Sequence, residues 1–259
     1  MMKKILISTL ILFLFTGCVS KTEQVDNTIE IEKVEEDNSE KYKEYASIWD
    51  ENHAYNDDYL GQVFFESGLI NEPVVQYTDN DYYLRKDFKT LEYSAMGTVF
   101  ADYEARYDSQ NITIYGHNAY SYYDAGLDEN GEKIDNDTLG FTSLKYLVDE
   151  SKYEENKTVY LLLENEIREY QIVSVFHVGL VYYEGNMYVD NEYVQYYLSE
   201  YSKSYFDTYK KEIVERQFYD TGIEFEYADK YLTLQTCVEG NDFAREVILC
   251  KEINRTIYR

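Results

Sequence analysis

Hydrophobic residues downstream of residue 60 are concentrated in short segments bounded by glycine, asparagine or aspartate. Short runs of β-branched and aromatic residues between turn-forming residues predict β-strands. Two longer runs, 157–163 and 167–183, are separated only by a short polar turn and predict a long hairpin. Many short strands with few helices favour a closed or nearly closed β-barrel over an α/β sheet. The predicted strands are 62–65, 73–76, 98–101, 111–115, 157–163, 167–183, 231–236 and 245–252.

Two segments have the spacing of an amphipathic helix. Residues 41–53 place an aromatic face, centred on Tyr45 and Trp49, where it should pack against the folded domain. Residues 191–218 form the one strong later helix and precede the strand at 231–236. The approximate apolar stripe of this long helix consists of Val194, Tyr197, Leu198, Tyr201, Tyr205, Tyr209, Ile213 and Phe218.

The N-terminal segment has the pattern of an export signal. Lys3 and Lys4 precede an apolar run over 5–15, which is too short to span a bilayer comfortably. The run ends in Phe-Thr-Gly-Cys18, which is close to a lipobox, where a lipid is attached to the cysteine. We predict a lipoprotein-type signal peptide over 1–17, lipidation of Cys18, an acidic tether over 18–40 and a folded domain over 41–259. An uncleaved N-terminal signal anchor is the alternative, and both place the domain on the extracellular face of the cell membrane.

The charge balance excludes one class of function. The chain has 24 basic and 50 acidic residues, a formal net charge of -26, which repels phosphate backbones and excludes nucleic-acid binding. The apolar content of 44% excludes wholesale disorder. Residues 124–137 match part of a calcium-binding loop, but Gly126 stands where the first carboxylate is needed. We interpret this segment as an acidic surface insertion and predict no metal site.

The candidate chemistry rests on a thiol, an imidazole and a guanidinium. Cys237 ends the segment Thr-Leu-Gln-Thr-Cys, Arg245 follows at the head of an apolar run, and His117 lies upstream in Tyr-Gly-His-Asn. A thiolate attacks a carbonyl, a neighbouring cation stabilises that thiolate, and an imidazole can pass a proton to the leaving amine. If Cys237 and Arg245 lie on adjacent antiparallel strands, the trio can carry out acyl transfer through a thioester.

Each of these residues also has a structural interpretation. A cysteine that ends a strand can belong to the core, a histidine after Tyr-Gly can be a turn residue, and an arginine that opens a strand can be solvated. Cys250 fits a small buried hydrophobe. His53 fits a surface residue and His177 a packed or half-exposed barrel residue. The joint appearance of His117, Cys237 and Arg245 in patterned segments favours the catalytic interpretation.

From about residue 56 to 253 the sequence resembles the sortases, and class B most closely. The N-terminal half carries NDD (56–58), INEPVVQ (70–76), DNDYYL (79–84) and GTVFAD (97–102). The histidine region carries YGHN (115–118) and FTSLKY (141–146). The C-terminal part carries YDTG (219–222), LTLQTC (232–237) and REVIL (245–249), and the order His, Cys, Arg is that of the family.

The resemblance implies a mainly β fold: a sortase-type eight-stranded β-barrel with N-terminal helices and one long helix before the catalytic-cysteine strand. It implies a cysteine transpeptidase, without a cofactor, that cleaves a C-terminal sorting signal of Asn-Pro-x-Thr type after Thr. Cys237 would carry the acyl group, His117 would act as general acid and base, and Arg245 would hold the substrate carbonyl and oxyanion. The implied partners are sorting-signal-bearing surface proteins, an amine acceptor (a peptidoglycan cross-bridge or a pilin lysine) and the membrane through the lipid anchor. The further oxyanion or substrate-binding candidates are Val238, Gln235, Tyr115, Asn118 and Thr236.

The sequence departs from the class B pattern in places that affect substrate choice. Gln235 stands where these enzymes usually have serine, Ala119 replaces a common methionine, and the insertion over 120–139 is longer than usual. Two other functions therefore stay open: a hydrolytic thiol peptidase, and a surface lipoprotein on a degenerate sortase scaffold that binds peptide or wall material without catalysis.

Overall fold

The computed structural model describes residues 38–120, 123–128, 130–183, 186–189 and 195–259. The predicted signal peptide, Cys18 and nearly all of the predicted tether lie outside these residues. Within the described ranges, no helix combines the length and the apolar composition needed to cross a membrane.

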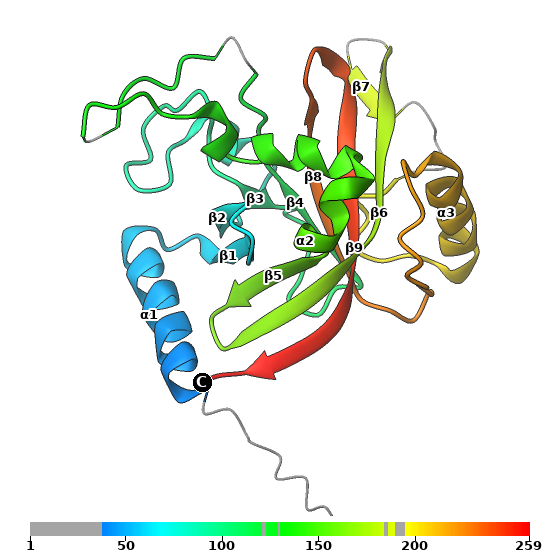
Figure 1. Ribbon diagram of the computed structural model, residues 1–259, viewed down its shortest axis with the longest axis horizontal. Coiled ribbons are helices and arrows are strands. Elements are labelled where there is room, and N and C mark those ends of the chain that lie inside the picture. Colours follow the sequence, from blue (N-terminus) through cyan, green and yellow to red (C-terminus); the bar gives the residue numbers. More distant parts are fainter. Residues whose placement is uncertain (1–37, 121–122, 129, 184–185, 190–194) are drawn as a thin grey trace, which may run out of the picture. The chain divides into compact units, whose positions relative to one another are not determined.

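The folded part is built on a closed eight-stranded β-barrel (Figure 1). The strands follow the order β5-β1-β2-β3-β4-β8-β9-β6, and β6 pairs with β5 to close the ring. The prediction of a closed barrel is therefore confirmed. The strands of the barrel are β1 (Tyr59–Phe65), β2 (Asn71–Val75), β3 (Phe100–Ala101), β4 (Asn111–Tyr115), β5 (Thr158–Leu163), β6 (Glu166–Tyr183), β8 (Tyr231–Val238) and β9 (Asn241–Ile257); β7 (Asn186–Val189) pairs only with the far end of β6.

Side chains that alternate along the strands fill the barrel. Along β1, every second residue is buried, as expected for a strand with one face on a core. Gly61 on this strand lies so close to β5 that a Cβ atom would meet the Leu162 carbonyl oxygen at 2.0 Å. A glycine is therefore required where the first and fifth strands meet. The interior core includes Val63, Val74, Ile114, Leu144, Leu161, Ile172, Leu234 and Ile248.

The N-terminal helix α1 (Ser39–Tyr55) forms where the aromatic spacing predicted it. Its Tyr45 packs with Leu162 and Ile167 on the outside of the barrel. Arg259 at the C-terminus donates to the carbonyl oxygen of Ala46 and pairs with Asp50 at 2.9 Å. The two ends of the described chain are thus joined.

The second predicted helix is much shorter than expected. Helix α3 covers only Lys203–Arg216, and Ser202 caps its first turn by accepting from the Tyr205 backbone N–H. The preceding residues 195–201 are irregular because they bond to the barrel: Tyr201 N donates to the Gln110 side chain, and Asn111 N donates to the Ser199 carbonyl. Predicted helix residues 191–194 lie outside the described part of the chain. The remaining helices are short: η1 (Tyr82–Arg85), η2 (Asn136–Thr138), η3 (Thr142–Val148), η4 (Glu150–Lys152) and α2 (Tyr153–Asn156).

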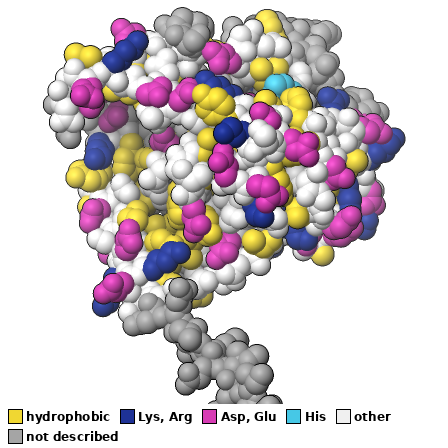
Figure 2. All heavy atoms as spheres, in the orientation of Figure 1, with side chains coloured by type: hydrophobic (Ala, Val, Ile, Leu, Met, Phe, Trp, Pro, Cys, Tyr) yellow, Lys and Arg dark blue, Asp and Glu magenta, His cyan; other side chains and the backbone are white. Residues whose placement is uncertain are grey.

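The insertion over 120–139 leaves the barrel after the histidine segment and returns at Gly140, which bridges to Asn118. Its described residues are exposed or half-buried. Asp137 anchors its end by pairing with Lys145 of η3 at 2.8 Å. Over the face drawn in Figure 2, acidic side chains are spread among basic and hydrophobic ones and do not gather in one patch.

Candidate active site

Three neighbouring strands bring the candidate chemistry to one end of the barrel. β8 runs parallel to β4, with Gln235 opposite Tyr115, and antiparallel to β9, with Cys237 opposite Arg245. The thiol and the guanidinium therefore lie side by side, which is the geometry expected from their spacing. His117 follows β4 by two residues and lies at the same end.

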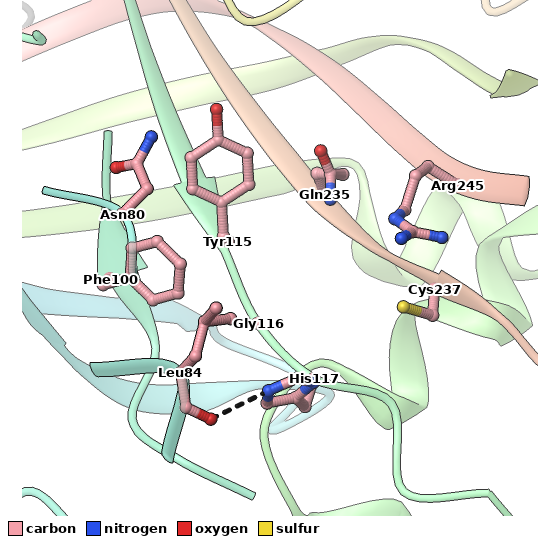
Figure 3. A pocket seen from close by; sticks show the side chains of 9 residues that line it. All are labelled: Asn80, Leu84, Phe100, Tyr115, Gly116, His117, Gln235, Cys237 and Arg245. Atoms are coloured by element: carbon pink, nitrogen blue, oxygen red, sulfur yellow. Dashed lines mark hydrogen bonds between the residues drawn. The ribbon is translucent and has the colours of Figure 1, made fainter. Parts of the chain in front are cut away.

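These side chains line a cavity of about 280 Å³. In Figure 3, Cys237 and Arg245 lie next to each other at one end, and His117 lies at the lower edge. The three groups thus share one cavity, although the middle of the chain separates His117 from Cys237 and Arg245. The lining residues are Asn80, Leu84, Phe100, Tyr115, Gly116, His117, Gln235, Cys237 and Arg245.

Cys237 is a free, half-buried cysteine at the end of regular β8 pairing. The register shifts immediately after it, and the chain turns through Gly240, which has φ of 75°. Asn118 donates from Nδ2 to the Cys237 carbonyl oxygen at 3.0 Å and so ties the histidine segment to the cysteine strand. Cys250, by contrast, is fully buried in the core, and burial raises the pKa of its thiol.

The His117 ring is held by its Nε2 atom. This nitrogen lies 3.0 Å from the Leu84 carbonyl oxygen and 2.9 Å from a guanidinium nitrogen of Arg85. Burial lowers the pKa of His117, Arg85 and Arg245 lower it further, and the Leu84 carbonyl opposes them. The neutral imidazole is therefore favoured at neutral pH.

The Arg245 guanidinium lines the cavity beside the thiol, and its Nη1 donates to the Ala244 carbonyl oxygen at 2.9 Å. Its planar donor fork is suited to a carbonyl oxygen that develops negative charge. Within the described residues, no group of three or more His, Cys, Asp or Glu side chains could hold a metal ion.

The further candidates divide into two sets. Tyr115 and Gln235 line the cavity; Tyr115 donates to Asp102 at 2.8 Å, and Gln235 accepts from Tyr196 at 2.7 Å. Burial, with help from Asp102, raises the pKa of the Tyr115 hydroxyl, which therefore stays protonated.

Three of the predicted residues do not line the cavity: Asn118, Thr236 and Val238. Asn118 acts through its bond to Cys237, described above. Thr236 is 1% exposed and, because strand side chains alternate, faces away from the cavity that Gln235 and Cys237 face. Val238 is half-buried at the register shift.

Sequence reasoning did not place Asn80, Leu84, Phe100, Gly116 or Arg85 in the site. All of these except Arg85 lie within motifs that the resemblance used, but no local pattern ties them to the cavity. Gly116 has a steric role, since a Cβ atom there would lie 2.5 Å from Cγ of the buried Phe141. The glycine lets the chain pass this ring and sets the position of His117.

Comparison with known proteins agrees with the barrel fold. No protein-family model matches the chain. Sortase B of Listeria monocytogenes is 24% identical over 200 residues, which cover 73% of this chain and 67% of that protein. The crystal structure of Clostridium perfringens sortase B is 29% identical, with a TM-score of 0.61, and covers 79% of this chain and 99% of that one. A Staphylococcus aureus sortase B–substrate complex, 18% identical with a TM-score of 0.63, covers 83% and 93% and supports the fold.

The closed eight-stranded barrel that holds this cavity has the fold of the sortases. Within that class the chain is similar to the class B sortases, and the prediction made from its motifs is confirmed. The similarity supports a sortase-type cysteine transpeptidase.

Proposed function

We propose that this chain is a class B-like sortase that cleaves a C-terminal sorting signal of Asn-Pro-x-Thr type after Thr and transfers the acyl group to an amine. The observation that carries the proposal is the pairing of Cys237 with Arg245 across β8 and β9, in a cavity that His117 also lines. A nucleophile, a proton carrier and an oxyanion donor are the three groups that this reaction needs.

The reaction proceeds through two acyl transfers. His117 takes the thiol proton of Cys237, and the sulfur attacks the threonine carbonyl carbon to form a tetrahedral oxyanion. Arg245 stabilises this oxyanion, together with the backbone N–H of Val238. The imidazolium returns its proton to the leaving amine as the C–N bond breaks, which leaves a thioester on Cys237.

The second half-reaction reverses these roles. The acceptor amine attacks the thioester carbonyl, His117 accepts the amine proton, and the C–S bond breaks to release Cys237 as a thiol. The thiol and the imidazole therefore exchange one proton in each half-reaction.

The rest of the cavity is suited to a short peptide. Leu84, Phe100 and the Tyr115 ring supply an apolar wall, and Asn80 and Gln235 supply amide groups. Such a mixture of apolar walls and a few polar groups fixes the orientation of a ligand. Gln235 is itself held by the Tyr196 hydroxyl, so its amide is oriented before substrate binds.

We also propose where this protein is located and which partners it has. Cys18 carries a lipid that holds the domain at the extracellular face of the membrane, where the substrates are surface proteins with a sorting signal. The acceptor is an amine of a peptidoglycan cross-bridge or a pilin lysine. Mass spectrometry of the mature N-terminus tests the anchor: a lipid-modified Cys18 supports it, and an intact leader beginning at Met1 refutes it.

Trapping the acyl-enzyme tests the catalytic proposal. The full-length chain is incubated with a library of sorting-signal peptides, and the protein mass is measured with and without an added amine. A thioester adduct on Cys237 and an amine-ligated product are expected. Cys237→Ala should lower cleavage by at least about 10³-fold while the protein stays folded. Cys250→Ala is the matched control and should retain cleavage, because this thiol is buried away from the cavity.

The same assay separates the alternatives. Cleavage without ligation at any amine concentration would identify a hydrolytic thiol peptidase. Tight peptide binding without an adduct or cleavage would identify a binding lipoprotein on the same scaffold.

A further inference from the structure

Arg85 ends helix η1 and contacts the imidazole of His117 from outside the cavity lining. The Arg85 side chain is exposed, and its Nη1 donates to the carbonyl oxygens of Leu84 and Ala95. The same Nη1 atom lies 2.9 Å from Nε2 of His117. Nη1 has two hydrogens, so the one that does not go to Ala95 lies between two acceptors, the Leu84 carbonyl oxygen at 3.3 Å and Nε2 of His117.

The two neighbours of Nε2 form hydrogen bonds with it in opposite directions, one as a donor and the other as an acceptor. A guanidinium has only donors and keeps its charge, so the Arg85 contact is a hydrogen bond only when Nε2 carries a lone pair. A carbonyl oxygen only accepts, so the Leu84 contact at 3.0 Å is a hydrogen bond only when Nε2 carries a proton. One nitrogen cannot satisfy both at once. The two bonds belong to two protonation states of the ring.

We propose that Arg85 is a positioning residue that sets the tautomer of His117. In the resting ring, Arg85 donates to Nε2 and the proton lies on Nδ1. In the working ring, Nε2 carries the proton and donates to the Leu84 carbonyl, so Nδ1 is the nitrogen that accepts a proton. Arg85 thus stabilises the tautomer that cannot take the thiol proton, and Leu84 stabilises the one that can.

The charges around the ring favour the same resting state. The charged and titratable groups that face His117 are Arg85 from η1, Arg245 from β9 and Cys237 from β8. Both guanidinium groups disfavour the imidazolium, as does burial of the ring, and only the Leu84 carbonyl stabilises it. Removing the Arg85 charge should therefore raise the pKa of His117 and move the proton of the neutral ring to Nε2.

Nitrogen NMR of the histidine rings tests this inference without relying on activity. The chain has three histidines, so ¹⁵N-histidine labelling of the full-length protein in detergent gives few signals, and His117→Gln assigns the one that matters. In the unmodified protein, Nε2 of neutral His117 should have the shift of an unprotonated nitrogen. In Arg85→Met, it should have the shift of a protonated nitrogen, with a raised pKa.

Arg106→Met is the matched control. Arg106 is also exposed and also donates to two backbone carbonyls, those of Tyr103 and Ala105, but it makes no contact with His117. It should leave the ring signals unchanged, and Arg85→Lys should restore the low pKa in part, because the charge remains. An Arg85→Met protein whose His117 keeps the original tautomer and pKa would overturn the inference.

The effect on turnover rests on the proposed sortase activity and is measured separately. In Arg85→Met, the acid limb of the kcat/KM profile should move to higher pH, since the neutral imidazole that takes the thiol proton then forms only at higher pH. An unmoved limb would overturn the catalytic part of the inference. If the unmodified protein cleaves no peptide, the proposed function fails, whereas the NMR result still decides the role of Arg85.

Discussion

Glu246 is a buried carboxyl on β9, next to Arg245 of the candidate active site. It is 2% exposed, follows Arg245 on β9 and pairs across the sheet with Thr236. Its Oε1 atom has no hydrogen-bond partner among the described residues, and Nε2 of His177 lies 4.0 Å from Oε2, too far for a hydrogen bond. Burial raises the pKa of Glu246 to about 7. We predict that Glu246→Gln stabilises the protein at alkaline pH.

The sign and size of the effect follow from proton linkage. The carboxyl has a pKa of 4.5 in an unfolded chain, so between pH 4.5 and 7 the folded state binds more protons than the unfolded state. The stability that the neutral Glu246 carboxyl contributes to the folded protein is therefore fully present below about pH 4.5 and is lost as the pH rises through about 7. At about 1.4 kcal/mol per pH unit, the loss reaches about 3 kcal/mol at pH 8. Glutamine has a similar shape and does not ionise, so the variant escapes this loss.

Urea unfolding between pH 4 and pH 8 measures the difference in unfolding free energy between Glu246→Gln and the unmodified protein. The difference should be near zero at pH 4 and reach about 3 kcal/mol in favour of the variant at pH 8. Burial lowers the pKa of His177, so at pH 8 its imidazole is neutral and forms no ion pair with Glu246. Glu150→Gln, at an exposed carboxyl, is the control and should show no such trend. A difference that does not change with pH, or a variant that is less stable at pH 8, would refute the reasoning.

Three further substitutions test the site. Gly116→Ala places a Cβ atom 2.5 Å from Phe141 Cγ and should lower the free energy of unfolding by about 1–3 kcal/mol, which a lower thermal midpoint would show. The same change should lower kcat/KM by displacing His117. An unchanged midpoint would contradict the close packing. Arg245→Lys should lower kcat/KM by about 10²–10³-fold, because one ammonium cannot reproduce the guanidinium fork, and unchanged kinetics would argue against its oxyanion role. Asn118→Ala removes the bond to the Cys237 carbonyl and should cost about 1 kcal/mol in urea unfolding, and equal stability would show that the bond contributes nothing net.

Local patterning was enough to locate the strands and to place Cys237 beside Arg245. Both depend on short-range regularities: alternation along a strand, and a short loop that joins antiparallel neighbours. The same alternation could have shown that Thr236 faces away from the cavity, since it lies between Gln235 and Cys237.

Other features depend on contacts between distant segments. The tyrosine stripe continues upstream of Ser202, so helical periodicity predicts too early a start for α3. Hydrogen bonds to Gln110 and Asn111 hold residues 195–201 in an irregular path instead. The contact between Arg85 and His117 joins the end of η1 to the segment after β4, and the two share no motif. Such pairings arise only when the barrel closes.

Strand β9 has a consequence for biosynthesis. It is a 17-residue strand near the C-terminus, and it pairs with both β6 and β8 while carrying Arg245. Because a polypeptide is made from its N-terminus, a growing chain contains Cys237 before it contains Arg245, which lies opposite it. The cavity that Cys237 and Arg245 line together can therefore form only after β9 has been synthesised.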